Sequence, residues 1–253
     1  SAASDVYKRQ GEGRGHFTQA ITLEEMLLRN GHEVVEVLVG KSSTRTLPGF
    51  FNRSIHAPVK RFISPNFLPT ADNKRANLTK SFAYNLLRLP EYLRSMYYIN
   101  QRIRETGAEV VINFYELLTG LTYALFRPSV PYICVGHQYL FLHRDFEFPD
   151  KNSCQLWMLR FFTRMTALRS SKKLALSFLE MEQDDMNQIV TVPPLIRQEV
   201  TAIRPEKGDY IHGYMVNSGF ADSVESFHAK HPEVPLTFFW DRSDAVSYTH
   251  LRA

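Results

Sequence analysis

The sequence lacks the features that mark several classes of protein. Only two cysteines, Cys134 and Cys154, occur among 253 residues, and they form no C-x-x-C pair and no zinc-type spacing. A disulfide scaffold and a zinc module are therefore excluded, and a reducing compartment is favoured. No apolar run approaches 18 residues, and the first residues contain no apolar core of a secretory signal. We expect a cytoplasmic protein without a transmembrane helix.

A strong excess of charge of either sign is also missing. Lysine and arginine number 30 against 26 aspartates and glutamates, which gives a net charge of +4. Both signs are scattered, whereas a nucleic-acid-binding protein gathers its basic residues into a stripe or patch. The hydrophobic fraction of 44% is that of a folded protein. The composition thus predicts a folded domain that does not bind nucleic acid.

Short β-branched segments alternate with helical patterns along the chain, which indicates an α/β fold with a mainly parallel sheet. The first strand should precede Gly11, where the sequence SAASDVYKRQ is a poor strand. Residues 41–71, with four prolines, are expected to form loops. The predicted strands are 32–39, 108–114, 131–135, 173–178, 189–192, 209–216 and 236–240. The predicted helices are 16–30, 73–106 with a break at Leu89-Pro90, 117–126, 153–170 and 218–230.

Neither end of the chain continues the pattern of its neighbours. Residues 1–9 and 243–253 resemble translated adapter sequence from sequencing reads, so we exclude both from the fold; ordinary frayed termini are the alternative. A linker near Pro193-Pro194 and residues 204–208 divides the remainder. Residues 10–204 form the expected first domain, and 205–242 form a single βαβ of a truncated second domain, since one βαβ cannot bury its own faces.

A glycine-rich loop at residues 11–16, Gly-Glu-Gly-Arg-Gly-His, is the strongest chemical signal. Glycines let the backbone approach a ligand, and the helix that follows offers free N–H groups to a phosphate. A dinucleotide fingerprint would need a glycine where His16 stands, and an acidic residue near Lys41 to bind the ribose. No Gly-Lys-Ser/Thr follows either, so nicotinamide binding and a Walker loop are both disfavoured.

His16 stands where the glycine-rich loop enters the helix. The positive end of a helix dipole lowers the pKa of an imidazole, which keeps it neutral and able to accept a proton. His16 is therefore a candidate general base that activates a hydroxyl group. A capping or packing histidine is the alternative.

Three polar residues follow predicted strands and are candidates for ligand binding. Glu116 comes after the strand at 108–114, and His137 and Gln138 come after the strand at 131–135. Ligands of open α/β sheets bind beyond the carboxyl ends of strands. The alternatives are a solvated loop carboxylate for Glu116 and local loop hydrogen bonds for the other two.

The predicted helix from Ser153 towards Lys173 mixes aromatic with basic residues. Such a helix can rest on an anionic membrane surface, which would suit a lipid-linked acceptor. A core-facing helix with a solvated basic face is the alternative.

The segment QGEGRGHFTQA, residues 10–20, resembles the opening motif of a bacterial and archaeal branch of GT-B glycosyltransferases. This branch is distantly similar to the N-acetylglucosaminyltransferases of cell-wall synthesis. Residues 112–116, 136–141 and 231–241 fit the same branch. The resemblance implies two Rossmann-like domains, the first for the acceptor and the second for a nucleotide-sugar.

The same resemblance implies a reaction and a set of contacts. A hexose would pass to a hydroxyl of a glycan or lipid-linked acceptor without a metal or other cofactor. His16 would be the base, and the loop residues would lie near the donor diphosphate: Gly11, Gly13, Arg14 and Gly15.

The sequence departs from that family where the donor site is expected, because the chain ends just past residues 240–242. We therefore expect that the chain as given does not transfer sugar efficiently. Two other functions stay open. A sugar-nucleotide epimerase shares the architecture but needs carboxylates around the cleft, and Glu116 is the single carboxylate among the candidate site residues. A non-catalytic α/β module would retain a glycan or phosphate site without turnover.

Overall fold

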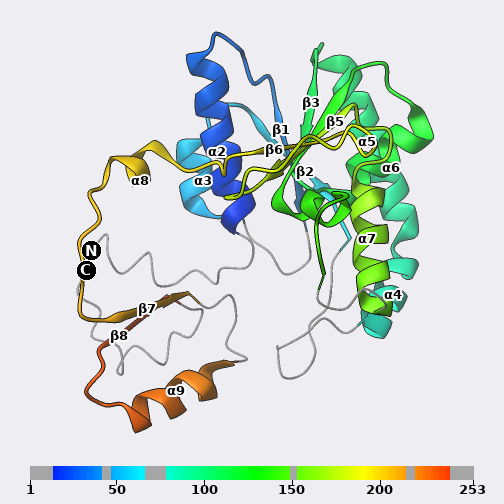
Figure 1. Cartoon of the computed structure of the whole chain (residues 1–253). Coiled ribbons are helices and arrows are strands. Elements are labelled where there is room, and N and C mark those ends of the chain that lie inside the picture. The colour runs from blue at the N-terminus through cyan, green and yellow to red at the C-terminus, as the bar shows by residue number, and fades with distance from the viewer. Residues whose placement is uncertain (1–13, 42–46, 66–77, 149–152, 215–219, 240–253) are drawn as a thin grey trace.

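Parallel β-structure flanked by helices forms the core of the protein (Figure 1). A computed structural model describes residues 14–41, 47–65, 78–148, 153–214 and 220–239. Strand β1 pairs with β2, strands β3, β4, β5 and β6 form a second sheet in that order, and β7 pairs with β8. All these pairings are parallel. The strands are β1 Val37–Lys41, β2 Val59–Ile63, β3 Val111–Asn113, β4 Tyr132–Val135, β5 Lys172–Leu176, β6 Ile189–Val192, β7 Ile211–Tyr214 and β8 Leu236–Phe239.

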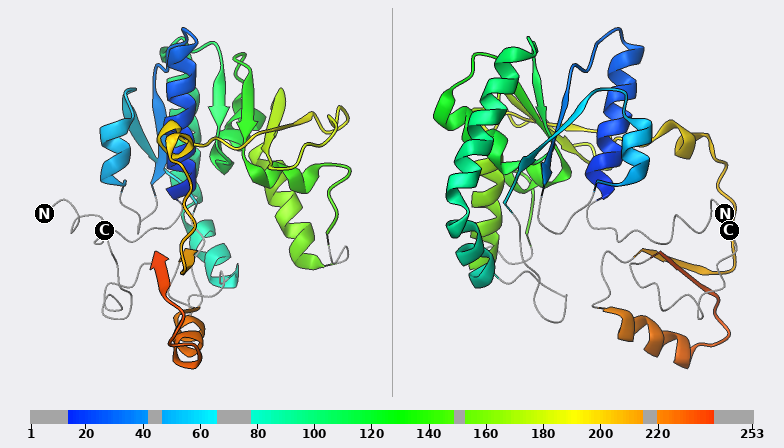
Figure 2. Two further views of the ribbon diagram at one scale, coloured as in Figure 1. Left: turned by 60° about the vertical axis from the view of Figure 1, so that its left-hand side comes forward. Right: turned by 180° about the vertical axis from the view of Figure 1, so that it is seen from behind.

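Helices cover both sides of the strands of the first two sheets. Helices α2 and α3 lie on one side, whereas α5, α6 and α7 lie on the other (Figures 1 and 2). The helical elements are α2 Arg14–Arg29, α3 Gly49–Ser54, α4 Leu78–Leu87, α5 Leu89–Glu105, α6 Leu117–Phe126, the 3-10 helix η1 His137–Leu142, α7 Cys154–Thr166, α8 Gln198–Ala202 and α9 Ala221–Lys230. The predicted α/β class and the break of the long helix at Leu89-Pro90 are confirmed.

The predicted late βαβ is present as β7, α9 and β8, and it lies apart from the other two sheets in both views of Figure 2. A connection that contains α8 leads to it. The domain boundaries at 10–204 and 205–242 stay a prediction. The strand expected before Gly11 lies outside the described residues.

The prediction of loops throughout residues 41–71 is wrong, because α3 and β2 occupy part of this segment. Strand β2 has the sequence Val-Lys-Arg-Phe-Ile directly after Pro58, and the two charged residues and the preceding proline remove the usual sequence pattern of a strand. The position of the chain before β2 is fixed by the buried carboxylate of Glu24 on α2, which accepts hydrogen bonds from the backbone N–H of His56 (2.9 Å) and of Ala57 (2.7 Å). This contact is long-range and cannot be found by periodicity.

The helix predicted over 153–170 is shorter than expected, since α7 ends at Thr166. Lys172 and Lys173 therefore belong to β5 rather than to a basic helix. Lys173 donates to the carbonyl oxygen of Asn187 at 2.8 Å. The idea that the whole range from Ser153 to Lys173 is one basic helical face is wrong.

Two hydrophobic cores lie under the first two sheets. The smaller packs α2 and α3 against β1 around Ile21, Phe51 and Ile55. The larger surrounds the four-stranded sheet and includes the fully buried Tyr132 and Tyr139.

Polar contacts join the two parts of the fold. Glu36, just before β1, accepts two hydrogen bonds of 2.9 Å from Arg102 of α5 and pairs with Lys60 of β2 at 2.9 Å. Within the described ranges, no helix is long and apolar enough to cross a membrane.

Helices α6 and α7 cross closely at Gly120. A Cβ atom at this position would overlap the carbonyl oxygen of Met165 and lie 2.8 Å from the carbonyl carbon of Thr166. These are backbone atoms of the neighbouring helix, so a rotamer change cannot relieve the clash. The glycine is therefore required by packing.

We predict that Gly120→Ala lowers the free energy of unfolding by at least about 2 kcal/mol, because overpacking at a backbone contact forces the helices apart. Urea unfolding followed by circular dichroism measures the loss. Gly15→Ala is the control, since nothing lies within 4 Å of the position that its Cβ atom would take. Equal midpoints for the two variants would contradict the close crossing.

Candidate functional site

The segments that follow β1, β2, β3 and β4 gather at one edge of the fold. Parallel strands send their carboxyl ends to the same edge, and ligands of α/β proteins bind there. Gly40 lies near the end of β1, Ser64 follows β2, Glu116 follows β3 and His137 follows β4. The first three of these residues are in contact, as the distances below show.

Glu116 is held in place by its own helix and by a neighbouring strand end. It is the N-cap of α6, and its Oε1 accepts from the N–H of Leu118 at 3.2 Å. The hydroxyl of Ser64 lies 2.9 Å from Oε1 and 3.0 Å from Oε2. The structure therefore makes Glu116 a fixed, half-buried carboxyl group, and the alternative of a freely solvated loop side chain does not hold.

The turn that presents Glu116 is fixed by a buried amide. Oδ1 of Asn113 accepts from the N–H of Glu116 at 2.9 Å, and Nδ2 donates to the carbonyl oxygens of Glu116 (3.1 Å) and Thr166 (2.9 Å). Tyr115 takes a left-handed conformation, with φ of 60°, and its hydroxyl lies 2.8 Å from Oγ1 of Thr163. The turn thus has contacts with both β3 and α7.

Burial raises the pKa of Glu116, and the hydrogen bonds from Leu118, Ser64 and Leu117 oppose that rise without cancelling it. Among the described residues, no cation contributes to the shift. The carboxyl group therefore lies in a site made of neutral donors.

Gly40 leaves the space that the carboxyl group occupies. A Cβ atom at position 40 would lie 2.8 Å from Cβ of Ser64 and 2.9 Å from Oε2 of Glu116. Any larger residue would push this pair away from the strand end.

His16 and His137 approach each other from distant parts of the sequence. Burial lowers the pKa of His16, and the charge of His137 lowers it further, while Gln19 opposes the change. Burial also lowers the pKa of His137. His16 is the third residue of α2. The main cause of its lowered pKa is burial rather than the helix dipole named in the prediction, and the lowered pKa favours the neutral imidazole.

Several polar atoms at this edge are buried and have no hydrogen-bond partner in the described part of the chain. They are Nδ1 of His16, Oε1 of Gln19 and Oε1 of Gln138. Leaving such an atom unpaired costs about 1–3 kcal/mol, so each calls for an explanation such as a ligand. Gln138 and His137 begin η1, next to the end of β4.

The predicted phosphate contacts are only partly described. Gly11 and Gly13 lie outside the described residues. Arg14 is the first residue of α2, and Gly15 is exposed. The contacts of these four residues with a diphosphate stay a prediction. No cluster of three or more metal-ligating residues occurs among the residues that the structure describes.

Three residues that contribute to this edge are not selected in the sequence analysis. Ser64 follows a strand that the sequence does not predict, so no pattern marks it. Gly40 directly follows the predicted strand 32–39, and Asn113 lies in the segment 112–116, but a glycine and an amide carry no signal of their own at such positions.

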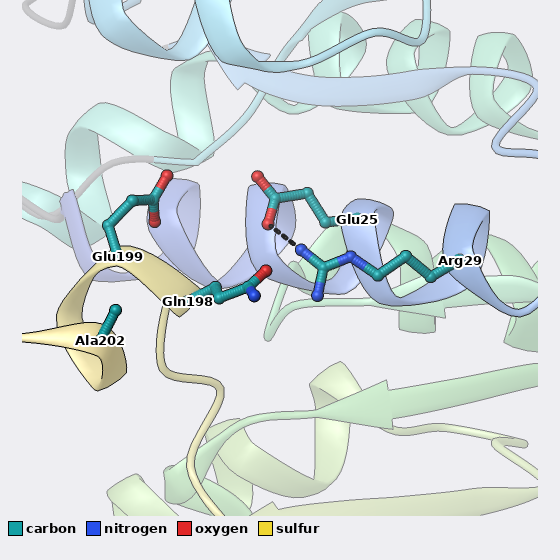
Figure 3. Close-up of a pocket in the computed structure, with 5 residues that line it drawn as sticks. All are labelled: Glu25, Arg29, Gln198, Glu199 and Ala202. Carbon is teal, nitrogen blue, oxygen red and sulfur yellow. Dashed lines mark ion pairs between the residues drawn. The ribbon is translucent and has the colours of Figure 1, made fainter.

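A pocket of about 300 Å³ lies elsewhere, between α2 and α8 (Figure 3). Its lining includes the ion pair of Glu25 with Arg29, at 3.5 Å. These two residues lie 9 to 13 positions after His16 on α2, which places them roughly 13–20 Å along the helix at 1.5 Å per residue. The pocket is therefore not part of the site at the strand ends.

The raised pKa of Glu116 predicts a pH-dependent stability. A carboxyl group whose pKa is higher in the folded than in the unfolded chain favours folding below its usual pKa of 4.5, and that contribution is lost as pH rises through the folded pKa. Glu116→Gln, which stays neutral, should therefore lose less stability than the unchanged chain as pH rises above the usual carboxyl pKa of 4.5. Urea unfolding at several pH values measures the difference.

Ser64→Ala is the matched variant. It removes a donor that lowers the pKa of Glu116, so stability should fall more steeply with pH than in the unchanged chain. If stability changed with pH in the same way in all three proteins, the pKa of Glu116 would not be raised in the folded chain.

Comparison with known proteins gives the following matches. The family profile described as glycosyl transferase family 1 matches residues 3–239. MurG of Acinetobacter baumannii is similar over 92% of this chain and 59% of its own, with 12% identity and a TM-score of 0.45. UGT89C1 of Arabidopsis thaliana, complexed with UDP-L-rhamnose, is similar over 88% of this chain and 61% of its own, with 12% identity and a TM-score of 0.50.

No curated protein matches the sequence. The chain spans about three fifths of the length of each of the two solved structures. The likeness to the Arabidopsis structure shows the fold, which is the predicted GT-B fold with parallel Rossmann-like sheets.

Proposed function

The chain belongs to glycosyl transferase family 1, and on this premise we propose that it forms the acceptor side of an enzyme that moves a hexose from a nucleotide-sugar to a hydroxyl group. The acceptor is a glycan or a lipid-linked glycan. The observation that carries the proposal is His16, which is kept neutral at the strand-end edge and whose Nδ1 has no hydrogen-bond partner among the described residues.

His16 has the properties that the transfer step requires. A neutral imidazole takes the proton of the acceptor hydroxyl while that oxygen forms a bond to the anomeric carbon of the donor sugar. The bond from this carbon to the diphosphate breaks, and the electron pair leaves with the diphosphate. Backbone N–H groups from Gly11 to Gly15 and the start of α2 stabilise the leaving charge without a metal ion.

The donor class is proposed from the fold. The Arabidopsis structure with the same fold is complexed with UDP-L-rhamnose, a nucleotide-sugar. We therefore propose a UDP-sugar or a related nucleotide-sugar as the donor, and titration calorimetry with UDP-sugars measures its binding.

We predict that His16→Ala removes hexose transfer from a nucleotide-sugar to a hydroxyl acceptor. Loss of a general base lowers the rate by about 10²–10⁴-fold. Turnover of radiolabelled nucleotide-sugars measures it. The control is His32→Ala, an exposed histidine just past the opposite end of α2.

The same protein distinguishes the alternatives. Isomerisation of the nucleotide-sugar without an acceptor would favour an epimerase. Glycan binding with no turnover in the unchanged protein would favour a binding module. Equal transfer by the two histidine variants would remove His16 from the mechanism.

A membrane-facing role for α7 has support from its surface. Trp157 is 63% exposed, Phe161 is 49% exposed, and their rings stack 5.3 Å apart. The opposite side of α7 faces the core through Thr163 and Thr166. We propose that this aromatic pair contacts the cytoplasmic face of a membrane, where a lipid-linked acceptor is available.

We predict that the double variant Trp157→Ala/Phe161→Ala reduces flotation of the protein with vesicles that contain phosphatidylglycerol. Phe178→Ala is the control, because it removes an aromatic side chain that is 88% exposed but lies outside α7. Flotation that is absent in the unchanged chain, or equal in all three proteins, would contradict membrane contact by α7.

A further inference from the structure

Helix α6 carries no charged side chain on any side. Its ten residues have the sequence Leu-Leu-Thr-Gly-Leu-Thr-Tyr-Ala-Leu-Phe. Thr119, Gly120 and Thr122 are buried on the side that packs against the rest of the protein. On the opposite side Leu121 is half-buried and Leu125 is 58% exposed. A helix without a polar outer face is normally covered, so the outer side of α6 is typical of a contact surface.

Helix α5 carries a second row of exposed apolar side chains. Leu89, Leu93 and Tyr97 are spaced by four residues, so they lie on one side of the helix. Their exposed fractions are 49%, 47% and 60%. The side of α5 that faces the core is a different one and includes Met96 and Ile99. The first turns of α5 are therefore apolar on two sides, although one of these sides faces solvent.

The two rows lie next to each other. Helices α5 and α6 are side by side on the side of the sheets away from α2 (Figures 1 and 2). The hydroxyl of Thr122 on α6 lies 3.5 Å from the carbonyl oxygen of Met96 on α5. The rings of Tyr97 and Phe126 make an edge-to-face contact with their centroids 6.3 Å apart. We call the two rows together the α5–α6 face, and its members are Leu89, Leu93, Tyr97, Leu121 and Leu125.

The absence of charge indicates what covers the α5–α6 face. In a dimer with a twofold axis, the same patch of each copy contacts itself, so like charges within the patch would repel. None of the five side chains of the face is charged, which makes self-contact favourable. An anionic membrane surface attracts helices that carry lysine or arginine, as α7 does through Arg160 and Arg164. Helix α6 contains neither residue type.

We propose that the α5–α6 face is the interface of a homodimer, in which α5 and α6 of one copy pack against α5 and α6 of a second copy about a twofold axis. Dimerisation is separate from the proposed function and holds whether or not the chain transfers sugar. His16 and the aromatic pair of α7 are not part of the face. The dimer therefore does not use the candidate base or the proposed membrane contact.

The size of the face predicts a reversible dimer. A stable interface of standard size uses about 20–30 residues of each partner. The α5–α6 face uses only the outer sides of two helices, which have 17 and 10 residues. Leu86 and Leu87, the last residues of α4, are exposed directly before α5 and add apolar surface at its start. We expect dimers that dissociate on dilution, with a dissociation constant in the micromolar range.

The test uses sedimentation velocity of the full chain over a wide range of protein concentration. The mean mass is expected to rise from that of one chain towards that of two. Leu93→Glu and Leu125→Glu each place an unpaired charge in the face of both copies, and each should weaken dimerisation by at least about tenfold. Leu28→Glu is the matched control, because Leu28 is 43% exposed on α2, on the other side of the sheets (Figure 1). Circular dichroism checks that each variant is folded.

The possible occupants of the face give different outcomes. The mass of one chain at every concentration, or equal association of the unchanged chain and both face variants, would overturn the dimer. Flotation of a monomeric chain with phosphatidylcholine vesicles that is lost in Leu93→Glu would assign the face to lipid and would also overturn the dimer. Association that is lost in Leu93→Glu and in Leu125→Glu but kept in Leu28→Glu would support it. Each substituted side chain is exposed, and two positions are tested separately, so the test stays decisive if one variant does not fold.

Discussion

The amide of Asn113 is the interaction on which the strand-end site depends. It is 2% exposed and makes hydrogen bonds with both backbone groups of Glu116 and with the last turn of α7. One side chain thereby holds the end of β3, the start of α6 and the end of α7 in one arrangement. The close crossing at Gly120 brings α7 within reach of this amide, and the left-handed Tyr115 completes the turn.

Much of the fold can be predicted from the sequence, because buried parallel strands carry a local signal. The predicted bounds of β6 agree with those observed, and the break in the helix before Pro90 follows from the missing N–H of proline. Strand β2 escapes prediction because it depends on contacts from elsewhere: Glu24 holds the chain before it, and Glu36 pairs with Lys60 within it.

The sequence predicts where the residues of the site lie relative to the strands better than it predicts which of them contact each other. A polar residue after a buried strand indicates the ligand edge, and this places Glu116, His137 and Gln138 correctly after β3 and β4. The sequence cannot pair Glu116 with Ser64, since that contact joins residues 52 positions apart through an unpredicted strand. It also cannot show that His137 lowers the pKa of His16.

The two hydrophobic cores meet at the strand pair that carries Gly40 and Ser64. One face of β1 and β2 packs against the core around Phe51, whereas Phe62 of β2 is buried in the core around Tyr132. The backbone N–H of Ile63, next to Ser64, also donates to the hydroxyl of Ser95 on α5. Because both cores hold these strands, local unfolding of either core disturbs the contact of Ser64 with Glu116. Hydrogen exchange in β2 would therefore report the integrity of both halves of the site at once.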